Sequence, residues 1–281
     1  TGSRMTPFPP ISSTASICCY PPENCGFAGS TTRHYPWSPM TSCAPTWKAL
    51  SQEAVHSRAH SKAQLYLERH GLSVDEYVQR GEWLFGTFLG EAPFGMKFLQ
   101  RKAIQKQWLV LRVGLIAAIE HFTGVLGQWA MDNDTWEENG DPAMVDLFKW
   151  HLAEEVEHRT VAFDLFEHLC KTQLGFYVSR QALMAIVFPL FIYFISEGGR
   201  SLARQDPDPS VRKMGRTLIP QLLMQLEQTG KRTENVPTFT FLVNATLRWL
   251  SPRFHPIHEG DTEQALGYLA RSPAAKAAAV H

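Results

Sequence analysis

Apolar side chains recur every three or four positions along most of the chain from residue 47 onward. This spacing places them on one side of an α-helix. Glycines at 71, 90, 198, 199 and 230 interrupt the pattern, and little of the sequence alternates as strands require. We therefore expect an all-α chain. The expected helices cover residues 48–70, 74–89, 93–131, 142–170, 173–196, 208–229, 237–250 and 261–271.

The two ends of the chain lack this helical period. We expect an irregular N-terminal segment over residues 1–46, a single helical domain over 47–271 and a frayed, Ala-rich tail over 272–281. Residues 1–5, TGSRM, are typical of an expression-tag remnant followed by an initiator Met. The first 40 residues are rich in Pro, Ser and Thr and show no signal-peptide pattern.

Charge and cysteine content narrow the function classes. Lys and Arg number 27 and Asp and Glu number 27, and the basic residues form no stripe, so we expect no nucleic-acid partner. The five Cys show no Cys-x-x-Cys spacing, which predicts neither a disulfide framework nor a zinc ribbon. A cytoplasmic location is the resulting expectation.

The most apolar stretch runs from Ala182 to Ile195 and contains Pro189. It is shorter than the roughly 20 residues that a membrane-spanning helix needs. Arg180 and Glu197 bound it closely. We expect a buried bundle helix here, with a membrane contact as the less favoured alternative.

Side chains that commonly bind metal ions gather in two short runs. In the first, Glu53, His56 and His60 fall within about 60° of one helix face, because each residue turns the helix by about 100°. A solvated, charged helix face is the alternative for such a run. A metal site is the other interpretation of the first run, and the second run supports it.

In the second run, His151, Glu155 and His158 also fall within about 60° of one another. Glu154 is as close to the two imidazoles by helical period, and only the order Glu-x-x-His favours Glu155. A buried Glu and His need partners or a metal ion. The same face continues with the apolar residues Phe148, Ala162, Leu165 and Leu169.

Glu120 lies in the middle of the stretch Trp108 to Trp129, which is apolar nearly all round. An unpaired buried carboxylate would cost several kcal/mol, so we expect a metal partner or, as the alternative, an ion pair with Arg112 or another neighbour. His121 is expected to pack or to position a ligand. Small residues around Glu120 leave room for a metal cluster or a substrate: Ala117, Thr123, Gly124 and Gly127.

The three helices together predict a bundle that holds two divalent metal ions. Carboxylates and imidazoles favour iron, with manganese or zinc as alternatives. Glu120 and Glu155 are also the candidate catalytic residues. The expected ligands are Glu53, His56, His60, Glu120, His151, Glu155 and His158.

The phrases SQEAVHSRAH, AIEHFTG, KWHLAEEVEHRTVAFD and PRFHP resemble a bacterial family of predicted metal-dependent hydrolases over about residues 47–260. The ligand order is similar to that of ferritin-like di-iron carboxylate proteins, and the second run is similar to p-aminobenzoate N-oxygenase. The resemblance implies a ferritin-like helical bundle with additional C-terminal helices. It also implies supporting or packing roles for Arg159, Phe163 and Asp164.

The activity that this resemblance implies is metal-dependent. Ligand chemistry favours oxygen activation on a small, partly apolar substrate held near Ala117, Gly124 and the 182–195 helix. Metal-assisted hydrolysis of an ester or phosphoryl bond and a non-catalytic metal-binding bundle are the alternatives. The sequence leaves open whether the chain forms a homodimer.

Members of this family carry a first helix with the motif Phe-Pro-x-Gly-Glu, and no such helix precedes Gln52. If the codons are read one base earlier, Ile17 to Asn24 can encode Leu-Leu-Leu-Pro-x-Gly-Glu-Leu. We therefore hypothesise that about residues 17–50 are a frameshifted translation of the missing helix. Glu23 lies at nearly the position of the missing carboxylate.

Overall fold

The computed structural model describes residues 64–88, 90 and 92–278. Within these ranges the chain is helical and contains no strand, which confirms the all-α class. The N-terminal segment, most of the first expected helix and the frameshift hypothesis fall outside them.

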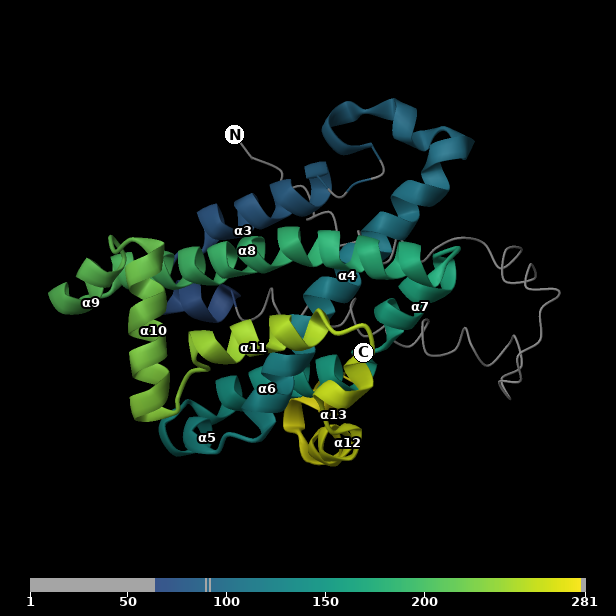
Figure 1. Ribbon diagram of the computed structural model, residues 1–281. Coiled ribbons are helices and arrows are strands. Elements are labelled where there is room, and N and C mark those ends of the chain that lie inside the picture. The colour runs from purple at the N-terminus through teal and green to yellow at the C-terminus, as the bar shows by residue number, and fades with distance from the viewer. Residues whose placement is uncertain (1–63, 89, 91, 279–281) are drawn as a thin grey trace.

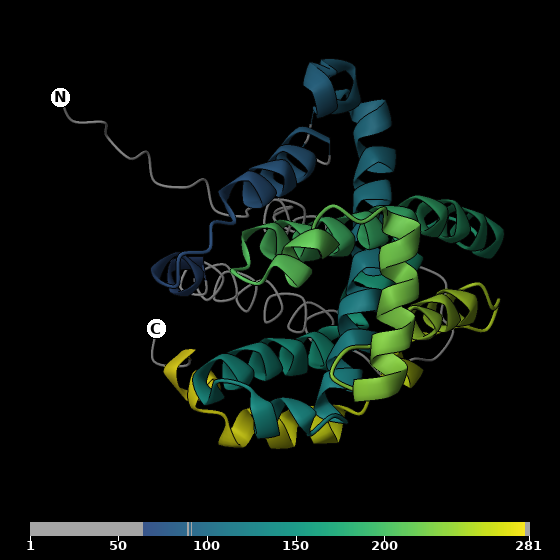
Figure 2. The same ribbon diagram turned by 90° about the vertical axis from the view of Figure 1, so that its left-hand side faces the viewer.

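The elements follow one another as a series of helices of very different length (Figures 1 and 2). An unlabelled helix covers 64–69. The labelled elements are α3 (Asp75–Trp83), the π-helical turn η2 (Leu84–Phe88), the 3₁₀ turns η3 (Pro93–Gly95) and η4 (Lys97–Gln100), α4 (Lys102–Met131), α5 (Thr135–Asn139), α6 (Pro142–His158), α7 (Val161–Leu169), α8 (Gln173–Gln205), α9 (Pro209–Met214), α10 (Ile219–Thr233), α11 (Phe239–Trp249), η5 (Pro256–Glu259), α12 (Thr262–Arg271) and α13 (Pro273–Ala278).

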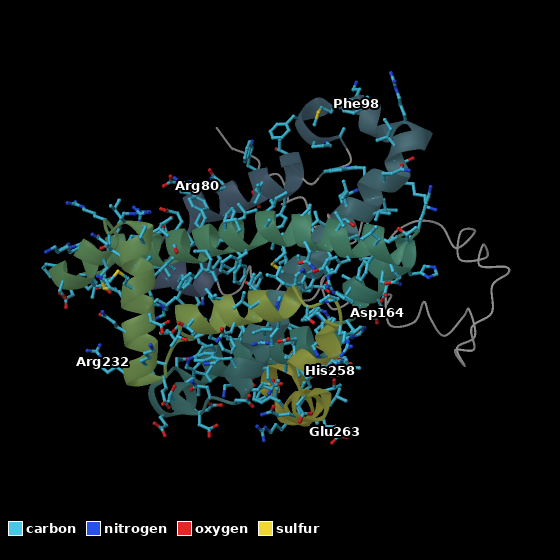
Figure 3. The ribbon with its side chains drawn as sticks, in the orientation of Figure 1. Arg80, Phe98, Asp164, Arg232, His258 and Glu263 are labelled. Atoms are coloured by element: carbon cyan, nitrogen blue, oxygen red, sulfur yellow. The ribbon has the colours of Figure 1, made fainter. Side chains whose placement is uncertain are left out.

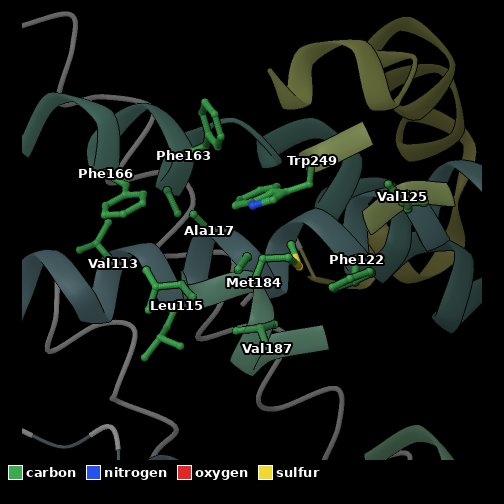
Figure 4. Close-up of a cluster of buried hydrophobic side chains, with 14 of the residues drawn as sticks. Val113, Leu115, Ala117, Phe122, Val125, Phe163, Phe166, Met184, Val187 and Trp249 are labelled. Carbon is green, nitrogen blue, oxygen red and sulfur yellow. The ribbon is translucent and has the colours of Figure 1, made fainter. Parts of the chain in front are cut away.

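Helix α4 is the centre of the core. Its sequence is apolar nearly all round, so it can be buried on several sides at once, and it packs against α6, α7, α8 and α11. The polar residues Arg80, Arg232 and Glu263 lie on the outside of the bundle (Figure 3). Aromatic and aliphatic side chains from the different helices meet around α4, among them Val113, Phe122, Phe163, Phe166, Met184 and Trp249 (Figure 4).

Three glycines set the distance between α4 and its neighbours. A Cβ atom at Gly127 would lie 2.5 Å from the backbone oxygen of Leu152 on α6, and one at Gly114 would lie 2.7 Å from the Phe166 ring on α7. At Gly124 the nearest atom would be the Arg159 Cβ, at 3.1 Å. Residues later in α4 thus meet earlier ones of α6, so the two helices are antiparallel.

The helix expected over 142–170 is instead two helices, α6 and α7, separated at Arg159 and Thr160. The hydrophobic period does not reveal this break because both residues keep α-region backbone angles. The side chain of Arg159 instead bonds to backbone from the C-terminal part of the chain. Phe148, expected on the apolar face, is 48% exposed.

The helix expected from residue 93 begins only at Lys102, after the two 3₁₀ turns. Phe94 and Gly95 have φ values of 51° and 76°, in the left-handed region that an α-helix excludes. This local reversal accounts for the delayed start of α4.

Helix α8 is longer than expected, since it runs through Pro189 and past Gly198 and Gly199 to Gln205. Arg180 and Glu197, expected to bound the apolar stretch, are both buried. Residues 104–131 and 173–205 form two helices that have the length and composition to cross a membrane. In the most apolar window, 56% of the first is buried but only 28% of the second. The expectation of a buried helix therefore holds for only part of α8.

Two segments expected to be irregular contain helices. The acidic connection 132–142 includes α5, and the buried Lys149 of α6 pairs with Glu137 there at 2.5 Å. In the expected tail, α13 packs on α6, and the Ala274 amide donates to Asp146 Oδ2 at 2.7 Å. The helix expected over 208–229 is divided into α9 and α10.

Replacing Gly127 with Ala tests the close packing of α4 and α6. The added Cβ would overlap the fixed backbone oxygen of Leu152, so we expect the free energy of unfolding to fall by about 1–3 kcal/mol. Urea denaturation measures it.

The matched control is Gly267→Ala in α12, where a Cβ would meet nothing within 4 Å. Alanine favours a helix over glycine by up to about 1 kcal/mol, so this variant should be as stable as the parent or more so. Equal effects of the two substitutions would contradict the packing argument.

Candidate metal centre

Glu155 is the best defined of the expected ligands. It lies on the side of α6 that faces α4, and only 5% of the residue is exposed. The Thr123 hydroxyl of α4 donates to its Oε2 at 2.6 Å. His151, one turn earlier, brings its Nε2 to 3.6 Å from Oε1. A buried carboxylate and an imidazole thus lie side by side at the contact between the two helices.

Helical period alone leaves Glu154 and Glu155 equivalent as ligands. In the structure Glu155 is buried, whereas Glu154 is partly exposed. The contact with Thr123 connects Glu155 to the neighbouring helix. This geometry favours Glu155 as the carboxylate of the Glu-x-x-His pair.

Glu120 and His158 belong to the same pair of antiparallel helices. The contacts of Gly124 with Arg159 and of Gly114 with Phe166 place Glu120 level with the junction of α6 and α7, just beyond the buried His158. Arg112 lies eight residues before Glu120 on the same helix, a separation of about 12 Å along the axis. This separation is long for a direct contact between the two side chains, and an ion pair of Glu120 with another neighbour stays a prediction.

The first run, Glu53, His56 and His60, lies outside the described residues. Among the residues that are described, no group of three His, Cys, Asp or Glu side chains could hold a metal ion. The expected cluster of seven ligands therefore stays a prediction. The described part contributes the juxtaposed pair of His151 and Glu155, together with Glu120 and His158 on the same two helices.

Among the described residues, neighbouring atoms occupy the space beside several of the small residues near Glu120. Arg159 and the α6 backbone fill the positions beside Gly124 and Gly127, and Ala117 is buried in the hydrophobic core. A pocket of about 220 Å³ lies elsewhere, near α5, and has no carboxylate or imidazole in its lining. The glycines serve helix packing.

His121 is a packing residue, in agreement with one of its two expected roles. It is buried against Phe122, Trp249 and Phe254. Its Nε2 forms a hydrogen bond of 3.1 Å with the Ala245 carbonyl oxygen. Burial lowers the pKa of the imidazole from 6.5 to about 4, so the ring is neutral near pH 7.

Arg159, immediately after the second run, ties the end of α6 to the C-terminal part of the chain. Its guanidinium donates to carbonyl oxygens of Pro256 at 2.9 Å, Ile257 at 2.8 Å and Gly260 at 2.7 Å. It also donates to the Thr262 hydroxyl at 3.0 Å and to the Val156 carbonyl. Burial lowers its pKa, although Asp261 and Glu259 oppose the shift.

Phe163 and Asp164 connect α7 to the phrase PRFHP, residues 252–256. The ring of Phe163 packs edge-on against Phe254 and His255. Asp164 Oδ1 lies 2.9 Å from His255 Nε2. Burial raises the pKa of Asp164, and the nearby His255 opposes that shift. Phe163 thus packs against this phrase and Asp164 makes a polar contact with it, while a supporting role for either at a metal site stays a prediction.

The sequence analysis did not predict the polar contacts of two residues, Thr123 and His255. Thr123 was counted only as a small residue, although its position one turn after Glu120 could have indicated a hydrogen bond to a facing helix. His255 lies 91 residues from Asp164, and nothing in the local pattern indicates that pairing.

Comparison with known proteins identifies a family. The sequence model of the family described as "predicted metal-dependent hydrolase" matches residues 48–260. No curated protein and no solved structure matches the chain.

The substitution Thr123→Val tests whether the hydroxyl supports Glu155. Valine keeps the branched shape but leaves Glu155 Oε2 without its donor, so we expect the free energy of unfolding to fall by about 1–3 kcal/mol. Thr123→Ser keeps the hydroxyl and serves as the control for lost methyl packing. Urea denaturation of both variants measures the difference, and a smaller loss for Val than for Ser would contradict the role of the hydrogen bond.

Proposed function

Because the chain belongs to the family of predicted metal-dependent hydrolases, we propose that it is a hydrolase whose divalent metal ions bind where α6 faces α4. Membership implies a divalent metal ion and leaves its identity open. The substrate that we propose is a small, partly apolar ester or phosphoryl compound.

The pairing of Glu155 with His151 is the observation that carries this proposal. A carboxylate buried this deeply is destabilised unless positive charge or hydrogen bonds compensate it. Thr123 supplies one hydrogen bond to Oε2, while Oε1 lies beside an imidazole nitrogen. This combination of oxygen and nitrogen donors fits a divalent cation such as Mn²⁺, Fe²⁺ or Zn²⁺.

Further ligands would come from α4, from α6 and from the segment of the first run. Glu120 lies on α4, whereas His158 lies on α6 with the pair and is buried. The segment that contains Glu53, His56 and His60 would supply the remaining donors. Two ions, in a ferritin-like arrangement of carboxylates and imidazoles, are the stoichiometry that we propose.

A bound divalent ion would lower the pKa of a coordinated water and polarise the bond to be cleaved. The protein's own residues would prepare the site. Thr123 holds one oxygen of Glu155 through its hydrogen bond and so restricts rotation of the carboxylate. We assign proton transfer from the attacking water to Glu120.

Oxygen activation by two iron ions is the second candidate. It is favoured by the ligand chemistry, since every candidate donor is a carboxylate or an imidazole and such sites suit iron. A metal-binding bundle without catalytic activity is the outcome if neither reaction occurs.

The first experiment compares Glu155→Gln with its neighbour Glu154→Gln. After loading with Mn²⁺ or Zn²⁺ and removal of excess ion, we expect the parent protein to retain at least one ion per chain by elemental analysis. Loss of the buried carboxylate should weaken metal binding by about tenfold or more, whereas Glu154→Gln should bind as the parent does.

Ester and phosphoester hydrolysis by the loaded protein is measured alongside, with Glu120→Ala as the variant that should lose activity while it retains a folded structure by circular dichroism. A metal content well below one ion per chain in the parent would refute the proposal. Hydrolysis that persists at the parent rate in Glu120→Ala would remove the assigned proton-transfer role.

The second experiment separates hydrolysis from oxygen chemistry. Protein loaded with Fe(II) without oxygen is mixed rapidly with O₂, and visible absorbance is followed with time. A transient absorbance that Glu155→Gln abolishes and Glu154→Gln keeps would support the di-iron candidate. Its absence in protein that retains iron would eliminate that candidate and leave the hydrolytic one.

A further inference from the structure

The connection between α3 and α4 projects from one end of the molecule. We call residues 83–106 the tip. It comprises the end of α3, the turns η2, η3 and η4, and the start of α4. Figures 1 and 2 both show it extending beyond the packed helices, and Figure 3 shows Phe98 at its outer end.

The tip exposes large apolar side chains at high density. Trp83 is 58% exposed, Phe94 57% and Phe98 46%. Exposed apolar residues are ordinary when scattered, but a contiguous group marks a surface that contacts a partner or a membrane. Among the side chains that the structure describes in the tip, the exposed large apolar ones are Trp83, Phe85, Phe94, Met96, Phe98 and Ile104.

Basic residues are interleaved with this apolar set. Lys97 follows Met96, and Arg101 and Lys106 lie on either side of Ile104, all three exposed. The sequence adds Lys102 and has no Asp or Glu between Ala92 and Lys106. Glu82 and Glu91 lie before this stretch. Residues 92–106 are therefore positively charged, although the whole chain has no formal net charge.

The backbone of the tip is held in a defined shape. Phe94 adopts a left-handed conformation, with φ 51°, that a bulky residue rarely takes. Its ring packs edge-on against Trp83, with centroids 6.2 Å apart. Pro93 beside it is buried, and the Trp108 indole donates to the Gly90 carbonyl at 3.0 Å. The aromatic rings are therefore presented by a turn that is anchored to α4.

We propose that the tip binds the surface of an anionic lipid bilayer. Aromatic rings enter the boundary between headgroups and acyl chains. Lysine and arginine keep their charges at the level of the lipid phosphates while their alkyl stems stay in the apolar layer. The tip is short, so the protein lies on one leaflet.

Charge favours a bilayer over a second copy of this chain as the occupant. A symmetric dimer through the tip would bring the same patch of each copy together. Lys97, Arg101 and Lys106 of one copy would then face the same residues of the other, and like charges at an interface oppose association. An anionic surface instead complements these cations.

Flotation of the full-length protein with lipid vesicles tests this proposal. We expect the protein to float with vesicles that contain phosphatidylglycerol, and to bind at least about tenfold less to vesicles of phosphatidylcholine alone. Raising the salt concentration to 1 M, where the screening length is about 3 Å, should release much of it.

Two variants of the tip separate its contributions. Phe94→Ser with Phe98→Ser should reduce binding about tenfold or more, and Lys97→Glu with Arg101→Glu should abolish the preference for anionic lipid. The control is Met224→Ser with Leu247→Ser, which removes exposed apolar residues of α10 and α11. It should bind as the parent does.

A measurement on the unmodified protein guards against misfolded variants. Lipids brominated on their acyl chains quench the fluorescence of tryptophan that enters the bilayer. They should therefore reduce the tryptophan emission of the parent protein, and this reduction should be absent in Trp83→Phe. Failure of the parent to float with anionic vesicles would overturn the proposal. So would light scattering that showed a dimer in the parent and a monomer in the Phe94→Ser, Phe98→Ser variant.

Discussion

The close approach of α4 and α6 determines where the candidate ligands lie. Because Gly127 has no side chain, the Leu152 carbonyl can occupy the space that a Cβ would need. The same approach brings the Thr123 hydroxyl within 2.6 Å of Glu155. Small residues near a carboxylate are thus explained by helix packing, and the polar contact follows from it. A wider spacing of the two helices would separate Thr123 from Glu155.

Arg159 fixes the other end of this arrangement. Water could satisfy three carbonyls and a hydroxyl of residues 256–262, yet the buried guanidinium of Arg159 donates to all four. Asp164 and His255 add a second link one turn later. The C-terminal helices therefore stabilise the junction of α6 and α7, next to His158.

The sequence was sufficient where a strong period or a local motif decided the outcome. The all-α class, the buried α4 with Glu120, and the packing role of His121 follow from residues close together in the chain. The sequence was insufficient where contacts between residues far apart in the chain determine the structure. The break after His158 depends on Arg159 and residues about 100 positions later, and the start of α4 depends on the positive φ of Phe94. Whether Glu53, His56 and His60 join the site stays a prediction.

The contacts of Arg159 also constrain the order of events during synthesis. Four of its five acceptors lie 97 to 103 residues after it, so α6 can form on the ribosome long before the backbone that holds its end has been made. Contacts of such sequence separation form late, because closing the intervening loop loses chain entropy. A nascent chain then carries His151 and Glu155 on a helix whose last turn is still unsecured, and the finished junction arises only once residues 256–262 have left the exit tunnel. Maturation of this helix pair is thereby coupled to the synthesis of residues 256–262.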